Sequence, residues 1–276
     1  MTRLTPEQVK NIPIDLQNYE QELIKKTEYS LLGIAKHTLN IRNDITSVLS
    51  KKTAAIIPIT AGKGTILGFT DAILAILTHI GLDTYITKKK DVGGFAEAIS
   101  EQADVLFAAD DNHFIAVNLR TRYISENSAC TGKAYIAALD LAVKGIKSKT
   151  VFIIGYGPVG QAATIELLDR RANAVLYDID KVKIGYAKRK FKDRVHIVHS
   201  IKEGLRYANL IVDATPMPDI ISEDMIKEDT FVVAPGIPLG LTSKALKKLT
   251  SKNLIHDSLE LGVVTMALDV LTGYDL

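Results

Sequence analysis

The sequence predicts an α/β protein built from two domains. A chain of 276 residues with 47% apolar residues is long enough to form two buried cores. Segments typical of strands alternate with segments typical of helices, which favours a parallel sheet covered by helices. In addition, the apolar run Thr150–Ile154 leads directly into Gly155-x-Gly157-x-x-Gly160. A strand that turns into a helix at this glycine pattern is typical of a dinucleotide-binding (Rossmann) domain.

Each glycine of this turn has its own physical role. The first permits the tight turn, the second lets the backbone approach a pyrophosphate, and the third lets the helix pack closely on the strand. The next predicted strand, 173–177, ends at Asp178, the separation expected for an acid that binds the adenosine ribose. Because a carboxylate there would repel a 2′-phosphate, we expect NAD rather than NADP. The alternative is a glycine turn of another α/β protein, with Asp178 as a surface acid.

The first half of the chain begins with a helical preface, from Thr5 to about Asn40. Thr5 suits the N-cap position and Pro6 suits the first helical position. Alternating strands and helices follow. We expect strands at 54–59, 84–87 and 104–108, and helices at 67–81, 95–102 and 131–143.

The second half supplies the strands that a doubly wound domain needs. They lie near Val151, Ala174, Val195, Leu210, Phe231 and Leu254. A glycine-containing charged connection at 144–149 marks the boundary between the two domains. We expect a substrate-binding domain at 1–147, an NAD-binding Rossmann domain at 148–260, and a last helix at 261–276 that returns to the first domain.

Charge and cysteine content exclude several classes of function. Lys and Arg (34) nearly balance Asp and Glu (32), so there is no electrostatic case for a nucleic-acid partner. The single cysteine, Cys130, cannot form an intramolecular disulfide or a multi-thiolate metal site, and no metal ligands occur at a known spacing. The apolar run 73–77 is too short to cross a membrane. We expect a soluble cytoplasmic protein that binds a small molecule, with Cys130 as a buried inert thiol; a homodimer is compatible with the sequence.

Loops that follow strands have the first claim on function, because ligands of open α/β sheets bind beyond the carboxyl ends of the strands. Thr215-Pro-Met-Pro218 and Pro235-Gly-Ile-Pro238 are stiff loops suited to border the nicotinamide and its ribose, or else ordinary turns. The residues that we expect to bind the cofactor are Gly155, Tyr156, Gly157, Pro158, Val159, Gly160, Asp178, Thr215, Pro216, Pro235 and Gly236.

The loop Asp110-Asp-Asn-His113 carries four polar residues directly after an apolar strand. Asp110 and Asp111 are the leading catalytic candidates, because a carboxylate can hold the ammonium form of an amine substrate and help to remove its proton. The alternative is that one of them caps a helix that begins near His113. His113 itself is more typical of a surface or packing histidine than of a base.

Other polar groups are weaker candidates. The loop 60–64 follows a strand but lacks the spacing of a Walker loop, so it belongs to the substrate domain. Asn127 and Thr131 lie where a helix begins, and capping explains them equally well. Glu260, with His256 and Asp257, either faces the cleft or is exposed at the end of the last strand.

Several short motifs together resemble the pyrrolysine synthase family over nearly the whole chain. These are Pro58-Ile-Thr60 with Gly62-x-Gly64, Ala109-Asp-Asp-Asn-x-Phe114, Cys130-Thr-Gly132, Ala214-Thr-Pro216, Pro235-Gly-Ile-Pro238 and Leu261-Gly262. The resemblance implies NAD-dependent oxidation of the terminal amine of 3-methyl-D-ornithyl-lysine, followed by ammonia loss and ring closure to pyrrolysine, the last step of pyrrolysine biosynthesis.

The resemblance also implies roles for individual residues. An N-terminal helix would close over the substrate, which here involves Leu4, Thr5 and the helix after Pro6. Asp110 would contact the substrate amine. The positions that match the substrate cleft are Thr60, Ala61, Phe69, Asn112 and Asn127. Ala61 departs from a serine of the family pattern, and Glu260 is offset by one from the family's C-terminal acid.

Two other functions remain open from the residues. One is another amino-acid or shikimate-type dehydrogenase, which should carry a lysine–aspartate catalytic pair that we do not find in the sequence. The other is a non-catalytic NAD-sensing protein, against which the polar loop at Asp110 argues.

Overall fold

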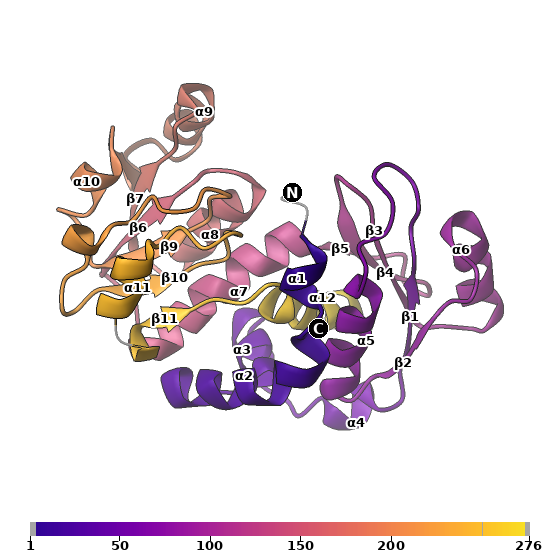
Figure 1. The fold of residues 1–276 in the computed structure, drawn as a ribbon. Helices are drawn as coiled ribbons and strands as arrows, with labels where there is room; N and C mark the ends of the chain where they lie inside the picture. Colours follow the sequence, from indigo (N-terminus) through magenta and orange to yellow (C-terminus); the bar gives the residue numbers. More distant parts are fainter. Residues whose placement is uncertain (1–3, 250, 274–276) are drawn as a thin grey trace.

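A computed structural model describes residues 4–249 and 251–273 and shows two α/β halves (Figure 1). The first contains a five-stranded sheet with the order β2-β1-β3-β4-β5, and the second a six-stranded sheet with the order β11-β10-β9-β6-β7-β8. The predicted fold class is therefore confirmed. The first and last residues of the predicted domains, 1–3 and 274–276, lie outside the described residues. Within these residues, no helix is both long and apolar enough to span a bilayer.

The helical preface consists of several helices rather than one. They are α1 (Pro6–Val9), α2 (Ile12–Thr27), α3 (Leu31–Thr38) and the short α4 (Thr46–Leu49). Thr5 is the N-cap of α1, and its backbone N–H donates to Oε1 of Gln8 at 2.8 Å. Helix α2 ends at Glu28, whose φ of 66° lies in the left-handed region and turns the chain into α3.

The first sheet is mixed, which corrects the prediction of a parallel sheet. Strands β1 (Thr53–Ile57), β2 (Asp83–Ile86) and β3 (Val105–Ala109) are parallel and connect through α5 (Phe69–His79) and α6 (Asp91–Ser100). Strands β4 (Phe114–Asn118) and β5 (Ile124–Glu126) are antiparallel. Only residues 110–113 separate β3 from β4, and so short a connection cannot cross over to a parallel strand.

The second sheet is parallel throughout, and all six predicted strands are present. These strands are β6 (Thr150–Ile154), β7 (Asn173–Tyr177), β8 (Val195–Ile197), β9 (Leu210–Asp213), β10 (Phe231–Val233) and β11 (Leu254–Ile255). The helices around it are α8 (Pro158–Asp169), α9 (Lys181–Phe191), α10 (Ile201–Gly204) and α11 (Ser243–Lys248), with 3₁₀ turns at Lys192–Arg194, Glu223–Met225 and Ser251–Asn253. Strand order reverses at β6, so the crevice for a ligand opens at its carboxyl end.

Helices α7 (Asn127–Ala142) and α12 (Glu260–Thr272) join the two halves through a shared core. Helix α7 packs against α8 at Gly132, where an added Cβ would lie 2.4 Å from the carbonyl oxygen of Val159. Helix α12 packs against α7 at Gly262, where a Cβ would lie 2.3 Å from Oγ1 of Thr131. Helix α12 also packs against α3, α5, β4 and β5, so the chain returns to the first half as expected.

We predict that Gly132→Ala lowers the free energy of unfolding by about 1–3 kcal/mol, because the methyl group overpacks the α7–α8 contact. The matched control is Gly185→Ala in α9, where only a guanidinium nitrogen of Arg189 lies near an added Cβ, at 3.7 Å. That variant should gain about 0.5–1 kcal/mol, because alanine is the better helix former. Urea unfolding of both variants checks the pair, and equal effects would contradict close helix packing.

Candidate active site

The glycine turn after β6 has the geometry needed to hold a pyrophosphate. Gly155 has a φ of +93°, and a Cβ there would lie 2.8 Å from the carbonyl oxygen of Ala214. A Cβ at Gly160 would lie 2.0 Å from the carbonyl oxygen of Gly155. At Gly157, by contrast, no atom of the described residues lies within 4 Å of an added Cβ, apart from those of its chain neighbours and its own helix. Two glycines are thus required by the protein itself, and the middle one faces open space at the N-terminus of α8, where a phosphate can approach.

Asp178 lies at the carboxyl end of β7, beside the glycine turn. Its Oδ2 accepts the N–H of Tyr156 at 2.6 Å, and its Oδ1 accepts the N–H of Asp180 at 2.8 Å. The Tyr156 side chain is buried, so this residue offers only its backbone to a ligand. Asp178 lines a separate cavity next to α9, with Tyr177, Ile179, Lys181, Ile184, Gly185, Lys188, Ile197, Val198 and His199. The place of this cavity beyond β7 suits the adenosine end of a dinucleotide.

A second cavity of about 290 Å³ lies between the halves, next to the glycine turn. It brings together predicted cofactor residues from three loops, at Gly157–Val159, Thr215–Pro216 and Pro235–Gly236. Leu4, Asn127 and Thr131 also line it. Ser128, Lys183 and Ser258 also line this space and were not predicted. Lys183 and Ser258 are distant in the sequence from the predicted loops, which gives no signal of proximity, whereas Ser128 directly follows the predicted residue Asn127. We refer to this space as the cofactor cleft.

A buried carboxyl group, Asp213, holds the loops that follow β9 and β10 in place. Its Oδ1 accepts hydrogen bonds from the backbone N–H (3.1 Å) and the hydroxyl (2.8 Å) of Thr215, and its Oδ2 accepts the N–H of Gly240 at 3.0 Å. Burial raises the pKa of Asp213. A Cβ at Gly236 would lie 2.1 Å from the carbonyl oxygen of Thr215, so the loops are in direct contact. Asp213 therefore shapes the cleft without lining it.

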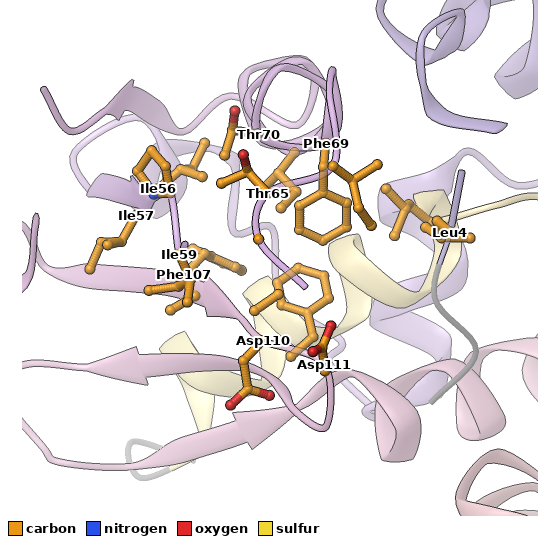
Figure 2. A pocket seen from close by; sticks show the side chains of 18 residues that line it. Leu4, Ile56, Ile57, Ile59, Thr65, Phe69, Thr70, Phe107, Asp110 and Asp111 are labelled. Atoms are coloured by element: carbon orange, nitrogen blue, oxygen red, sulfur yellow. The ribbon is translucent and has the colours of Figure 1, made fainter. Parts of the chain in front are cut away.

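A third cavity, in the first half, is mainly apolar (Figure 2). It lies beyond the carboxyl ends of β1 and β3, and its enclosed volume is about 70 Å³. The lining residues are Leu4, Ile56, Ile57, Pro58, Ile59, Gly64, Thr65, Ile66, Phe69, Thr70, Ile73, Phe107, Ala108, Ala109, Asp110, Asp111, Phe114 and Leu259. Leu4 and Leu259 also line the cofactor cleft, so the two spaces share a wall. We call this space the apolar cavity.

Asp110 and Asp111 lie at one edge of the apolar cavity, and their carboxyl groups point in different directions (Figure 2). Oδ1 of Asp110 accepts the N–H groups of Asn112 and His113, both at 2.7 Å. These backbone hydrogen bonds hold the pKa of Asp110 below its usual range, so the group is a carboxylate at neutral pH. The helix-capping alternative is wrong, because the loop is the turn between β3 and β4 and no helix begins near His113.

Asp111 connects its own loop to the loop at 60–64. Its Oδ2 accepts the N–H of Lys63 at 2.9 Å. The same oxygen lies under Gly62, where an added Cβ would be 2.2 Å away and where φ is +68°. A residue other than glycine at position 62 would therefore displace the Asp111 carboxylate. The sequence motif had indicated a polar loop but not this contact.

The structure separates the remaining predicted substrate residues. Phe69 lines the apolar cavity and its ring packs edge-on against Phe114, with 5.5 Å between ring centroids. The hydroxyl and the N–H of Thr60 are both bound by Asp91 at the start of α6. Asn127 lines the cofactor cleft instead. Thr5, Ala61 and Asn112 lie nearby in the chain but outside the lining of the apolar cavity.

Asp257 and Glu260 form a buried acidic pair behind Leu259, with only 8% and 7% of their surfaces exposed. The hydroxyl of Tyr19 donates to Oδ2 of Asp257 at 2.7 Å, and the N–H of Asp257 donates to the hydroxyl of Tyr135 at 2.9 Å. Oε2 of Glu260 accepts the N–H groups of Ser258 (3.1 Å) and Leu259 (2.8 Å). Exposure at the strand end is therefore excluded for both acids, and neither lines the apolar cavity or the cofactor cleft.

The acidic pair titrates unusually for physical reasons. Burial, and then the charge of Asp257, raise the pKa of Glu260 to about 8. Burial also raises the pKa of Asp257, although the hydroxyls of Tyr19 and Tyr135 oppose this shift. Because two like charges this close in a buried site are unfavourable, the pair retains a proton near neutral pH.

Cys130 behaves as expected of an inert thiol. It is buried in α7, with its Sγ 3.2 Å from the hydroxyl oxygen of Ser125. Burial raises its pKa to about 12, so the nucleophilic thiolate does not form at neutral pH.

The family model described as pyrrolysine biosynthesis protein PylD, N-terminal domain, matches residues 8–125. The chain is 30% identical over 271 residues to the pyrrolysine synthase of Methanosarcina acetivorans, covering 98% of this chain and 100% of that one. It is 28% identical to the pyrrolysine synthase of Methanosarcina barkeri, covering 98% of each. The shikimate dehydrogenase of Aquifex aeolicus has a similar fold, with a TM-score of 0.57 at 16% identity over 81% of this chain and 92% of that one.

We predict that the buried proton makes stability depend on pH. The folded protein keeps the proton of Glu260 up to about pH 8, whereas the unfolded chain releases it near the ordinary value of 4.5. The folded state therefore binds more protons between these values, and stability falls as pH rises from about 5 to about 8. Glu260→Gln should remove this dependence. The melting temperature of the variant should therefore rise relative to that of the wild type as pH rises.

Thermal melts at several pH values between 5 and 8.5 measure this difference. The control is Glu228→Gln, which changes an exposed acid in the second half. A constant difference between Glu260→Gln and the wild type across the range would exclude a raised pKa at Glu260.

Proposed function

Because the chain belongs to the pyrrolysine synthase family, we propose that it catalyses the NAD-dependent oxidation of the terminal amine of 3-methyl-D-ornithyl-lysine. Loss of ammonia and ring closure to pyrrolysine would follow, as the final step of pyrrolysine biosynthesis. The observation that carries this proposal is the shared wall at Leu4 and Leu259 between the apolar cavity and the cofactor cleft. A substrate carbon in the first space would face a nicotinamide in the second.

The residues present fit a nicotinamide dinucleotide. The open space at Gly157 would receive its pyrophosphate, the cavity at Asp178 its adenosine, and the loops at Thr215 and Pro235 its nicotinamide ribose. When bound, NAD supplies the acceptor for the hydride of the amine-bearing carbon. We propose that 1–147 form the substrate domain, 148–260 the NAD domain and 261–276 the returning helix.

Asp110 would bind and orient the substrate amine. Its low pKa makes it a stable carboxylate partner for an ammonium group but a weak proton acceptor. We therefore assign it charge pairing at the edge of the apolar cavity, where Ile59, Phe69 and Phe114 would contact the aliphatic chain. Asp111 adds a second negative charge and holds the loop at 60–64 closed against this edge.

Ring closure requires that two ends of the substrate meet. After oxidation, the α-amine of the ornithine part attacks the imine carbon, and the resulting aminal expels ammonia as the cyclic imine forms. If water first hydrolyses the imine to the aldehyde, ammonia leaves at that step, and the attack of the α-amine on the aldehyde then releases the water again. A confined apolar space favours this attack because it holds the reacting atoms close together and limits competing water. The cavity volume of about 70 Å³ is smaller than such a substrate, so we infer that Leu4, which lines the cavity, moves together with helix α1 when the substrate enters.

The direct test is to incubate the purified protein with NAD and 3-methyl-D-ornithyl-lysine. NADH absorbance should rise together with the mass of the pyrroline product. NADH without the cyclic product would indicate another amine dehydrogenase, and neither signal in a protein that binds NAD would indicate a sensor.

We predict that Asp110→Ala lowers kcat by about 100-fold or more, in the range typical of lost acid–base or charge-pairing groups, and leaves the Kd for NAD within about twofold. The matched control is Asp83→Ala, which removes an exposed acid at the opposite edge of the same sheet. Unchanged turnover of Asp110→Ala would remove this residue from the site.

We predict that the wild type binds NAD more tightly than NADP, and that Asp178→Ala reduces this preference by roughly tenfold, the value of one hydrogen bond to a charged group. Calorimetric titration with each dinucleotide measures the preference. An equal preference for NAD over NADP in the wild type and the variant would mean that Asp178 does not bind the adenosine ribose.

A further inference from the structure

We propose that Asp257 is a positioning residue that ties the helix bearing the substrate cover to the wall shared by the two cavities. The cover is α1 with Leu4, and the helix that bears it is α2. The wall is the segment Ser258–Leu259. The expected effect on substrate binding rests on the proposed function. The connection between α2 and the wall does not, because it can be measured without turnover.

The contacts of Asp257 join three helices that are distant in the sequence. Its Oδ2 accepts the hydroxyl of Tyr19 in α2 at 2.7 Å, and its backbone exchanges hydrogen bonds with the hydroxyl of Tyr135 in α7 (2.9 and 3.2 Å). The third group that faces it, Glu260, is the first residue of α12. A hydrogen bond to a buried charged group is stronger than one in water, so the Tyr19 contact is a firm connection.

Helix α2 bridges the two halves, which is why one contact can matter. On the side of the second half, Nζ of Lys26 donates to the carbonyl oxygen of Leu254 in β11 at 2.8 Å, two turns from the Tyr19 contact. On the side of the first half, Glu20 accepts the N–H of Leu31 (3.0 Å) and pairs with Nε2 of His79 in α5 (2.9 Å). If the halves separate, the contacts on one side of α2 must break.

The cover is attached to this bridge by a short connection. Only Lys10 and Asn11 separate α1 from α2, so the position of α2 restricts that of α1 (Figure 1). At its other end, Leu4 lines both cavities together with Leu259. Leu259 is two residues after Asp257, and the N–H groups of Ser258 and Leu259 are held by Glu260. The wall and the cover are therefore fixed by one buried cluster.

The mechanism does not otherwise use this cluster, because Asp257, Glu260, Tyr19 and Tyr135 do not line the apolar cavity or the cofactor cleft. Burial of a carboxyl group destabilises the folded state unless the group is paired, and an apolar residue of the same volume would avoid this loss of free energy. A role in fixing the relative position of α2 and the wall explains why such groups occur here.

Tyr19→Phe tests the link, because it removes one hydroxyl and keeps the ring. Tyr123→Phe is the matched control. The hydroxyl of Tyr123 also donates to a partly buried carboxylate, Oδ2 of Asp269 at 3.3 Å, but this contact lies away from the cover. Hydrogen exchange of the backbone at residues 5–10, measured with saturating NAD and without substrate, reports the cover. Steady-state kinetics with 3-methyl-D-ornithyl-lysine reports the consequence for catalysis.

We expect Tyr19→Phe to speed hydrogen exchange at residues 5–10 by about tenfold and to raise KM for the substrate by about tenfold, which is the effect of losing one hydrogen bond to a charged group. The values of kcat and of the Kd for NAD should change by less than about twofold. Tyr123→Phe should leave all four values near those of the wild type. Unchanged exchange in Tyr19→Phe overturns the proposal, whatever the kinetics show. Faster exchange in a protein without activity on this substrate would retain the link and instead refute the proposed function.

Discussion

The close approach of α7 to α8 is the contact on which the arrangement of the site depends. Gly132 of α7 lies against the carbonyl oxygen of Val159, and Val159 belongs to the turn that would hold the cofactor. The same helix begins at Asn127, in the cofactor cleft, and packs against Gly262 of α12. Because interiors are close-packed, these contacts restrict the position of the glycine turn relative to the first half. The cleft between the halves is thus a consequence of helix packing.

Five carboxyl groups in or near the apolar cavity and the cofactor cleft show how the environment gives the same chemical group different roles. Backbone N–H groups keep Asp110 ionised at the edge of the apolar cavity, which suits it to pair with an ammonium group. Asp111 accepts a hydrogen bond from the neighbouring loop, at the N–H of Lys63. Asp213, Asp257 and Glu260 are buried, and burial raises their pKa values. These three shape loops and hold helices, whereas Asp110 and Asp111 line the apolar cavity.

Much of the fold could be predicted because local patterns carried it. Apolar runs and glycine positions located every strand of the second sheet, and the residue spacing located Asp178 beside the glycine turn. Strands β4 and β5 were missed because strand–helix alternation was extended too far along the chain. The turn-forming residues 110–113 between two apolar segments do indicate a hairpin between β3 and β4. Thr60 was placed at the substrate by its motif, but its hydroxyl is committed to Asp91, a partner 31 residues away.

The fold class, the glycine turn, the strands of the second sheet and the family could be predicted from the sequence alone, since these depend on short-range patterns and on similarity along the chain. Only the tertiary structure decided that Leu4 and Leu259 form one wall, that Lys183 and Ser258 border the cofactor cleft, and that Asp257 meets Tyr19 across 238 residues. The physical reason is that burial and the fine position of side chains are set by packing between distant elements. A glutamate such as Glu260 looks the same in the sequence whether it faces water or a buried aspartate.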